Sequence, residues 1–206
     1  RIRAVRTARI ARKHLEIVEM TKQIQEAYIV ATTRTPVGKA PRGVFKNTRP
    51  DDLLVATIKN ALKQVPTLDP AAIEDAIVGC AMPEGEQGMN VAKIATLLSG
   101  LPKTVAGATV NRFCAAGITA VSMAADRIRV GEAEVMLAGG VESMSMVPMG
   151  GSKPSFNPKV VDLDENVGIA YGMGMTAEKV AEQWKVTREE QDAFATESHR
   201  RAIAAQ

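Results

Sequence analysis

Side chains that bind metal ions or form disulfides are scarce in this sequence. Its 206 residues include two histidines, His14 and His199, and two cysteines, Cys80 and Cys114. Neither a CxxC nor an HExxH pattern occurs, so we expect no metal site. Two cysteines form at most one disulfide, which argues against a disulfide-rich secreted scaffold. A reducing compartment is favoured, and the expected location is the cytoplasm.

Long apolar runs and a charge bias are also lacking. No apolar stretch approaches the roughly 20 residues that a membrane-spanning helix needs, so no membrane span is expected. The formal net charge is +3, but residues 1–19 hold six basic and two acidic residues, a net of +4, which leaves −1 for the remainder. A body without a basic excess gives no support to nucleic-acid binding.

The basic N-terminal segment, residues 1–26, differs from the rest of the chain. An arginine-rich, acid-free start from Arg1 to Lys13 is typical of an organelle transit peptide, although the serine content of such peptides is absent. The interpretation we prefer is that Met20 is the natural start and residues 1–19 are an upstream extension. The segment is expected to lie outside the fold.

Strand-like and helix-like segments alternate from Ala27 onward. Short apolar runs predict strands at 28–31, 76–80, 104–110 and 134–140. Caps, prolines and apolar spacing predict helices from Thr48 to Val65, from Val91 to Leu98 and from Cys114 to Gly131. This βαβαβαβ order with near-continuous apolar strands predicts an α/β fold, with a mostly parallel sheet covered by helices on both faces.

The regular alternation lapses after Gly140 for about thirty residues rich in Met, Gly and Pro. Helices are predicted to resume at Thr176 and at Thr187. The spacing of Thr187 and Glu190 predicts a capping box at the second start. We therefore expect residues 27–140 to be the core and residues 141–206 to be the start of an inserted loop domain. The last helix reaches Gln206 without a stop signal, so the sequence is interpreted as a fragment.

Cys114 lies where a predicted strand meets an apolar helix. A cysteine in the first turn of a helix is close to unpaired N–H groups and partial positive charge, which favour thiolate over thiol. The helix carries no charge before Asp126, so we expect it to be buried on all sides, with its N-terminus opening into a sheltered site. Cys114 is thus a candidate nucleophile; a buried cysteine acting as a small hydrophobe is the alternative.

Two features that follow the last predicted strand leave alternatives open. Glu142 is a candidate general base or an ordinary strand-end carboxylate. Met144, Met146 and Met149 are candidates for lining an acyl pocket, or they pack within their own loop.

Ordered motifs are spread along the chain at Arg34–Gly38, Asn111–Gly117, Ala138–Ser145, Met175–Glu178 and Arg188–Ala195. Together they resemble the N-terminal half of the thiolase family, and most closely its degradative acetyl-CoA acyltransferase branch. The resemblance runs from about Ala27 to the end of the chain.

The resemblance implies a thiolase-like fold and thiolytic cleavage of 3-ketoacyl-CoA in fatty-acid β-oxidation. The family cysteine that matches Cys114 attacks the 3-keto carbonyl, releases acetyl-CoA and holds the shortened acyl chain as a thioester until coenzyme A accepts it. Met173 matches a family position that touches the pantetheine and acyl region. Coenzyme A thioesters are the implied substrates, no cofactor is implied, and the whole enzyme is expected to be a homo-oligomer.

The family takes its acid/base groups from a second, homologous half. They are a histidine in a Gly-His-Pro motif, an asparagine in an Asn-Glu-Ala-Phe motif and a second cysteine; neither Cys80 nor His199 matches them. Gly172, where biosynthetic members often carry histidine, mildly favours the degradative branch. The alternatives are a biosynthetic acetoacetyl-CoA thiolase or ketoacyl synthase-like condensing enzyme, and an inactive fragment that only binds acyl-CoA or a partner chain.

Overall fold

The structure is a computed structural model that describes residues 24–160, 162, 168–169 and 171–206. Residues 1–23 of the basic N-terminal extension, including Met20, lie outside the described part. The chain divides after Lys153 into two compact units. Val147 is fully buried within the first unit. The division into a core up to residue 140 and the start of a loop domain after it stays a prediction.

The helices and strands of each unit follow one another in the predicted order. The first unit contains α2 (Pro50–Gln64), η1 (Pro70–Ala72), β1 (Asp75–Gly79), η2 (Gly85–Gln87), α3 (Val91–Leu98), β2 (Ala108–Val110), η3 (Phe113–Ala115), α4 (Ala116–Arg129) and β3 (Met136–Gly140). The second contains η4 (Pro158–Val160), α5 (Met173–Trp184) and α6 (Arg188–Ala205).

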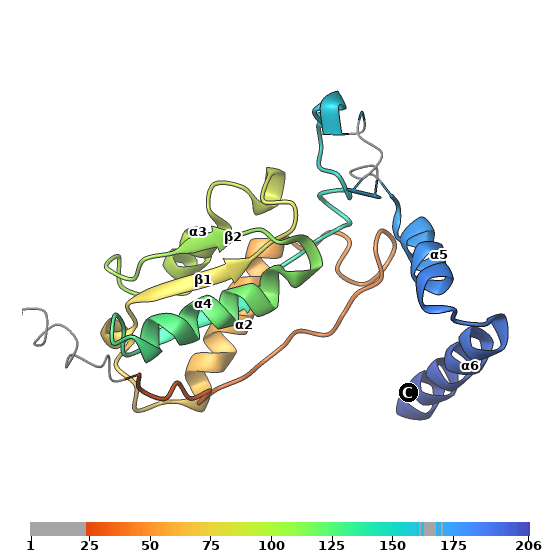
Figure 1. The fold of residues 1–206 in the computed structure, drawn as a ribbon. Helices are drawn as coiled ribbons and strands as arrows, with labels where there is room; N and C mark the ends of the chain where they lie inside the picture. Colours follow the sequence, from red (N-terminus) through yellow and green to blue (C-terminus); the bar gives the residue numbers. More distant parts are fainter. Residues whose placement is uncertain (1–23, 161, 163–167, 170) are drawn as a thin grey trace, which may run out of the picture. The chain divides into compact units, whose positions relative to one another are not determined.

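The sheet is parallel, as predicted, and β1 is its central strand. The strand order is β2-β1-β3. Val78 is in register with Thr109 of β2 and with Gly139 of β3. Helix α4 runs along one face of the sheet, and α2 and α3 cover the other (Figure 1). The prediction of an α/β fold with helices on both faces is confirmed.

Alternate residues of β1 supply the two halves of the hydrophobic core. Val78 and Cys80 point to one face, where they join apolar side chains of α2 and α3 such as Leu54 and Val91. Ile77 points to the other face and packs against α4. Successive side chains of a strand point to opposite faces of the sheet. Because both faces are covered by helices here, the buried part of β1 is apolar at every position rather than at alternate ones.

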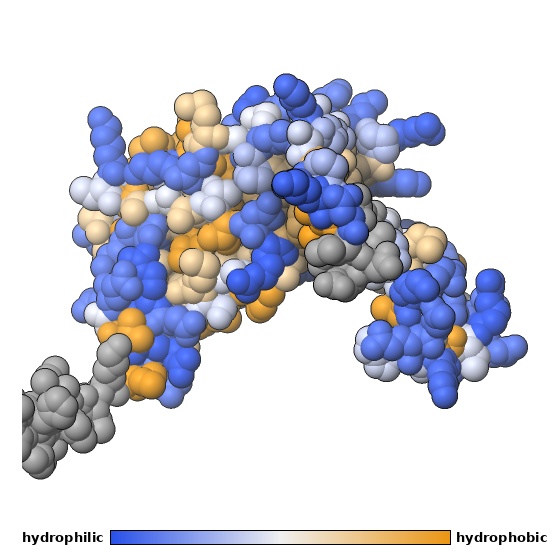
Figure 2. Space-filling view, turned by 45° about the horizontal axis from the view of Figure 1, so that its top comes forward, coloured by the Kyte–Doolittle hydropathy of each residue, from blue (hydrophilic) through white to orange (hydrophobic). Residues whose placement is uncertain are grey.

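The predicted first strand, residues 28–31, is not formed. The segment is extended but unpaired, and Tyr28, Ile29 and Val30 are 78%, 75% and 75% exposed. The sheet consists of β2, β1 and β3, and the segment pairs with neither outer strand. In the space-filling view, apolar side chains stand at the surface among hydrophilic ones (Figure 2). The prediction of a buried strand is therefore wrong, because an apolar run does not by itself specify a strand edge to pair with.

Residues 24–26 also differ from the prediction that the basic extension lies outside the fold. The backbone N–H of Gln25 donates to the carbonyl oxygen of Arg129 at 3.0 Å, and its side-chain amide donates to the carbonyl of Ile128. Carbonyls at a helix C-terminus have no partner within the helix. Gln25 therefore supplies a donor to the Arg129 carbonyl, while the Ile128 carbonyl also accepts from the Gly131 N–H at 3.0 Å.

Two helix termini illustrate how local chemistry sets the element bounds. Helix α6 begins with the predicted capping box, in which Thr187 Oγ1 accepts from the Glu190 N–H at 3.2 Å and Glu190 Oε2 accepts from the Thr187 N–H at 2.8 Å. Helix α2 begins at Pro50, two residues after the predicted start, and its N-cap is Arg49 without a side-chain cap, rather than the hydroxyl of Thr48. The proline at the first position still fixes φ for the helix.

Gly79, the last residue of β1, allows α4 to approach the sheet closely. A Cβ atom built on Gly79 would lie 2.4 Å from the carbonyl carbon of Ala116 and 2.6 Å from the backbone nitrogen of Gly117. Both neighbours are backbone atoms, which cannot move aside as a flexible side chain does. Only glycine at this position lets the first turn of α4 rest on the end of the strand.

The substitution Gly79→Ala is expected to push the first turn of α4 away from the sheet and to lower the free energy of unfolding by about 1–3 kcal/mol. Denaturant unfolding measures the loss. Gly139→Ala is the matched control, because a Cβ on Gly139, in the adjacent strand, meets nothing within 4 Å. Equal stability of the two variants would contradict the close approach.

Candidate functional site

Cys114 lies at the carboxyl end of the parallel sheet. It occupies the 3₁₀ turn η3, between β2 and α4, and its side chain is exposed. The carboxyl edge of a parallel sheet is where ligands of α/β proteins bind. The position expected from the sequence is thus confirmed, although the residue precedes α4 by a short turn rather than standing within its first turn.

The backbone before Cys114 is held in an unusual conformation. Phe113 has a φ of 46°, in the left-handed region that bulky side chains rarely occupy. Asn111 Oδ1 accepts from the Phe113 N–H at 2.8 Å, and the carbonyl of Arg112 accepts from the Ala115 N–H at 3.0 Å. These bonds stabilise a tight turn that presents residue 114 to solvent. Sequence analysis assigned no role to Asn111, although asparagine is a common residue of such turns.

The N-terminus of α4 has no side-chain cap. Its N-cap residue is Ala115, whose methyl group accepts no hydrogen bond. The N–H groups at a helix N-terminus without a cap, together with the helix dipole, favour an anion or a developing negative charge. Cys114 is adjacent to this end of the helix. The arrangement suits a thiolate and the oxyanion formed when it attacks a carbonyl.

Helix α4 is not buried on all sides, and the site is not sheltered, contrary to the sequence prediction. Ala116, Ala120 and Ala124 face the sheet and are buried, whereas Ile118 is 70% and Met123 is 42% exposed. One alanine stripe is enough to pack the helix on the sheet, and the described residues leave the opposite face open. The apolar composition of the helix indicated a second covering layer that these residues do not supply.

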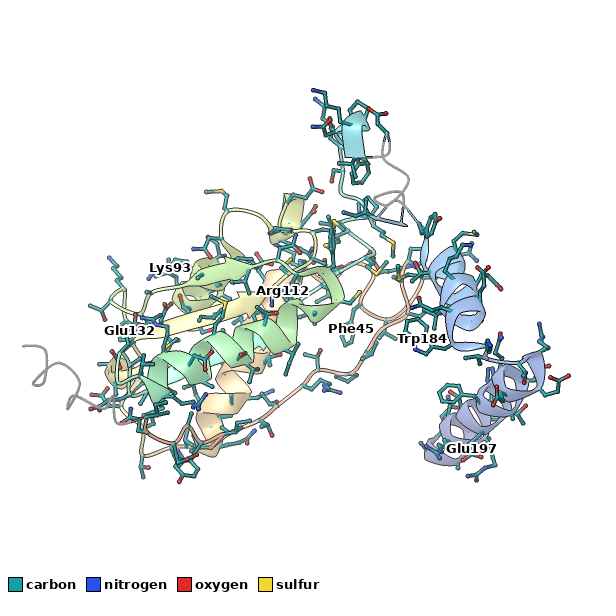
Figure 3. All side chains as sticks on the ribbon, in the orientation of Figure 1. Phe45, Lys93, Arg112, Glu132, Trp184 and Glu197 are labelled. Atoms are coloured by element: carbon teal, nitrogen blue, oxygen red, sulfur yellow. The ribbon has the colours of Figure 1, made fainter. Side chains whose placement is uncertain are left out.

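An open groove of about 270 Å³ lies along this exposed face of α4, directly after Cys114. Its lining residues are Arg112, Ile118, Thr119, Ser122 and Met123. The guanidinium of Arg112 contacts the Thr119 hydroxyl at 3.4 Å, which places a positive charge beside the start of the helix. Figure 3 shows Arg112 at the N-terminal end of α4 and Glu132 beyond its C-terminal end.

Glu142, which follows β3, has both carboxylate oxygens engaged. Oε2 accepts from the Ala81 N–H at 2.6 Å, and Oε1 accepts from Gln87 Nε2 at 2.8 Å. Gln87 is fully buried, and the oxygen of its side-chain amide, Oε1, accepts from the Ser143 N–H. The structure therefore supports the strand-end carboxylate interpretation over the general base. Gln87 was not identified from the sequence, because nothing in its local pattern marks a buried amide.

Cys80, the second cysteine, is in a different environment from Cys114. It is 1% exposed, and its sulfur lies 4.0 Å from Glu142 Oε1. Burial, reinforced by the negative charge of Glu142, raises the pKa of the Cys80 thiol to about 11. Cys80 is consequently a neutral thiol near pH 7 and behaves as a small core residue.

The three methionines proposed to line an acyl pocket, Met144, Met146 and Met149, all lie in the first unit, and Met146 is half-buried. Met144 and Met149 are 46% and 69% exposed. Met173 is the first residue of α5 in the second unit and is 64% exposed. The role of Met173 in acyl binding stays a prediction.

Within residues 24–160, 162, 168–169 and 171–206, no group of three or more His, Cys, Asp or Glu side chains is arranged to hold a metal ion. No helix of the described part is long and apolar enough to cross a membrane.

Comparison with known proteins gives one consistent class. The family described as thiolase, N-terminal domain, matches residues 27–206. The 3-ketoacyl-CoA thiolase of Bacillus subtilis (strain 168) is 44% identical over 182 residues, 88% of this chain and 46% of the relative. The 3-ketoacyl-CoA thiolase of Shewanella oneidensis is 44% identical over 183 residues, with the same coverage of 88% and 46%.

A solved structure agrees with this class. The crystal structure of the Bacillus anthracis acetyl-CoA acetyltransferase superposes with a TM-score of 0.74 at 34% identity, covering 90% of this chain and 48% of that one. The fold is thus that of a thiolase-type α/β protein. The chain is a member of the thiolase family, and it spans about half the length of the curated relatives it matches.

The two cysteines are expected to differ sharply in reactivity. Near pH 8, iodoacetamide should alkylate exposed Cys114 and leave buried Cys80 unlabelled, because the raised pKa keeps the Cys80 thiol protonated until the pH approaches about 11. Peptide mass spectrometry after brief labelling measures both. In denaturant the two should label alike; equal labelling in the folded protein would refute the assignment.

Proposed function

We propose that the protein is an acetyl-CoA C-acyltransferase that cleaves 3-ketoacyl-CoA by thiolysis, with Cys114 as the nucleophile. The observation that carries the proposal is the position of Cys114, exposed at the uncapped N-terminus of α4 and at the carboxyl end of the sheet. The family membership and the names of the 44% identical relatives support the same chemistry.

In the first half-reaction, Cys114 Sγ attacks the C3 carbonyl carbon of the substrate. The bond between C2 and C3 breaks, its electron pair stays on C2, and protonation of C2 gives acetyl-CoA. The shortened acyl group remains on Cys114 as a thioester. The uncapped N–H groups at the start of α4 support this step, because they stabilise negative charge on sulfur and on the carbonyl oxygen.

In the second half-reaction, the thiol of coenzyme A loses its proton to a base and attacks the thioester carbonyl. The carbon–sulfur bond to Cys114 then breaks, releasing the shortened acyl-CoA and the free cysteine. The first step breaks a carbon–carbon bond and forms a second thioester, and the second step exchanges one thioester for another. Neither step is an oxidation or a reduction, so the proposed reaction needs no cofactor. Residues 24–153, the described part of the unit that holds Cys114, contain no histidine. The acid/base groups are therefore proposed to come from another part of the whole protein, as the family resemblance implies.

The proposal extends to the biological setting and the substrate. We place the protein in fatty-acid β-oxidation in the cytoplasm, acting as a homo-oligomer, with Met173 touching the pantetheine and acyl region of the substrate. The Bacillus anthracis acetyl-CoA acetyltransferase, at 34% identity, favours a second candidate, a condensing enzyme that joins two acetyl-CoA molecules. Dependence of the thiolysis rate on acyl-chain length separates the two, because a condensing enzyme of that kind prefers the shortest substrate.

In the whole protein, Cys114→Ala is expected to lower kcat for thiolysis by more than about 1000-fold, since the proposed thioester cannot form without the Cys114 sulfur. The decrease of 3-ketoacyl-CoA absorbance measures the rate, and intact mass detects the acyl adduct. Cys80→Ala is the matched control and should retain activity and adduct formation. Full activity of Cys114→Ala would exclude the proposed mechanism.

Residues 1–206 by themselves are expected to show no sustained thiolysis, because they carry the proposed nucleophile without the acid/base groups of the family. Slow acylation of Cys114, at most one acyl group per chain, is the expected result by intact mass. This measurement also addresses the non-enzymatic alternative, in which these residues only bind acyl-CoA or a partner chain. Multiple turnovers that disappear in Cys114→Ala would contradict the expectation.

A further inference from the structure

The backbone of Ala81 connects the carboxyl ends of all three strands. Ala81 is the second residue after the end of β1. Its N–H donates at 2.6 Å to Oε2 of Glu142, which is the second residue after the end of β3. Its carbonyl oxygen accepts from Asn111 Nδ2, at the end of β2, at 2.9 Å. Side chains from both outer strands thus hold one residue of the central strand's extension.

Asn111 transmits this attachment to the turn that contains Cys114. While its amide nitrogen is bonded to Ala81, its oxygen accepts from the Phe113 N–H at 2.8 Å. Phe113 is the residue with a φ of 46°, immediately before Cys114. A bulky residue keeps such a conformation only where its surroundings fix it, and both ends of the Asn111 side chain contribute to fixing it.

Glu142 itself is held by a buried amide. Gln87 Nε2 donates both to Glu142 Oε1 at 2.8 Å and to the carbonyl oxygen of Met82 at 2.9 Å. Because Gln87 is fully buried, its amide cannot turn to solvent without leaving polar atoms unpaired. The carboxylate is therefore a fixed acceptor rather than a mobile surface charge.

We propose that Glu142 is a positioning residue for Cys114. It orients Ala81, Ala81 orients Asn111, and Asn111 holds the Phe113–Cys114 turn against the N-terminus of α4. The inference rests on the proposed function only in taking Cys114 as the nucleophile. Glu142 touches neither the substrate nor the reacting atoms; its contribution is the placement of the sulfur relative to the helix end.

The test uses the whole protein with the variants Glu142→Ala, Glu142→Gln and Asn111→Ala. Glu142→Gln keeps one acceptor oxygen but turns an NH₂ group toward one of the two donors, so it is a milder change than Glu142→Ala. Asp75→Asn is the matched control. It makes the same change of charge at the opposite end of β1, where Asp75 accepts from the Ala76 N–H and pairs with Arg127.

Two readouts separate positioning from general stability. The first is the pH dependence of Cys114 alkylation without substrate, which is expected to shift in Glu142→Ala and Asn111→Ala and to stay unchanged in Asp75→Asn. The second is thiolysis, where we expect kcat to fall about 10–100-fold with little change in KM. Glu142→Gln should give a smaller effect in the same direction.

A double-mutant cycle tests the order of the connection. If Glu142 acts through Ala81 and Asn111, the double variant Glu142→Ala with Asn111→Ala should lose no more kcat than Asn111→Ala alone. Unchanged alkylation and kcat in folded Glu142→Ala or Glu142→Gln, or losses that multiply in the double variant, would overturn the proposal. Failure of the proposed function would be recognised separately, because it would appear as thiolysis retained in Cys114→Ala. The alkylation test uses no substrate, so its result does not depend on that activity.

Discussion

The contact between the backbone of Gly79 and the first turn of α4 is the constraint on which the candidate site depends. It brings the helix N-terminus down onto the carboxyl end of β1, where a Cβ would lie 2.4 Å from Ala116. The turn before α4 must then be compact, and it exposes Cys114 together with Phe113 and Ala115. The nucleophile, the helix dipole and the sheet edge coincide because one glycine permits the approach.

Much of the fold could be predicted from the sequence because it follows from local chemistry. Helix Val91–Leu98 was predicted at its observed bounds, and the capping box of Thr187 and Glu190 was recognised from spacing alone. The buried run around Val78 predicted a strand of a parallel sheet, which the pairing confirms. In each case the signal lies within a few residues of the element that it specifies.

The errors arise where a partner distant in sequence decides the outcome. Apolar residues 28–31 indicate burial but not which strand edge is free. Helix α4 carries no charge before Asp126, yet only one side of it, with Gly117 and the alanine stripe, meets the sheet, and Ile118 stays exposed. Cys114 was located from its motif, whereas the attachment through Asn111 and Gln87 depends on Ala81 and Glu142, about 30 and 55 residues away. Pattern reasoning has no access to such hydrogen bonds.

The alanine at the N-cap of α4 implies a compromise between folding and chemistry. A serine, threonine, aspartate or asparagine at such a position stabilises a helix by about 0.5–2 kcal/mol relative to alanine. Its oxygen would, however, occupy the amides that now face the Cys114 turn, and an aspartate would repel an anion there. Ala115 therefore places no side-chain oxygen on those amides, at the expense of helix stability, an instance of the trade-off between stability and activity. By this reasoning, thermostabilisation of the family by optimising helix caps would need to spare this one helix.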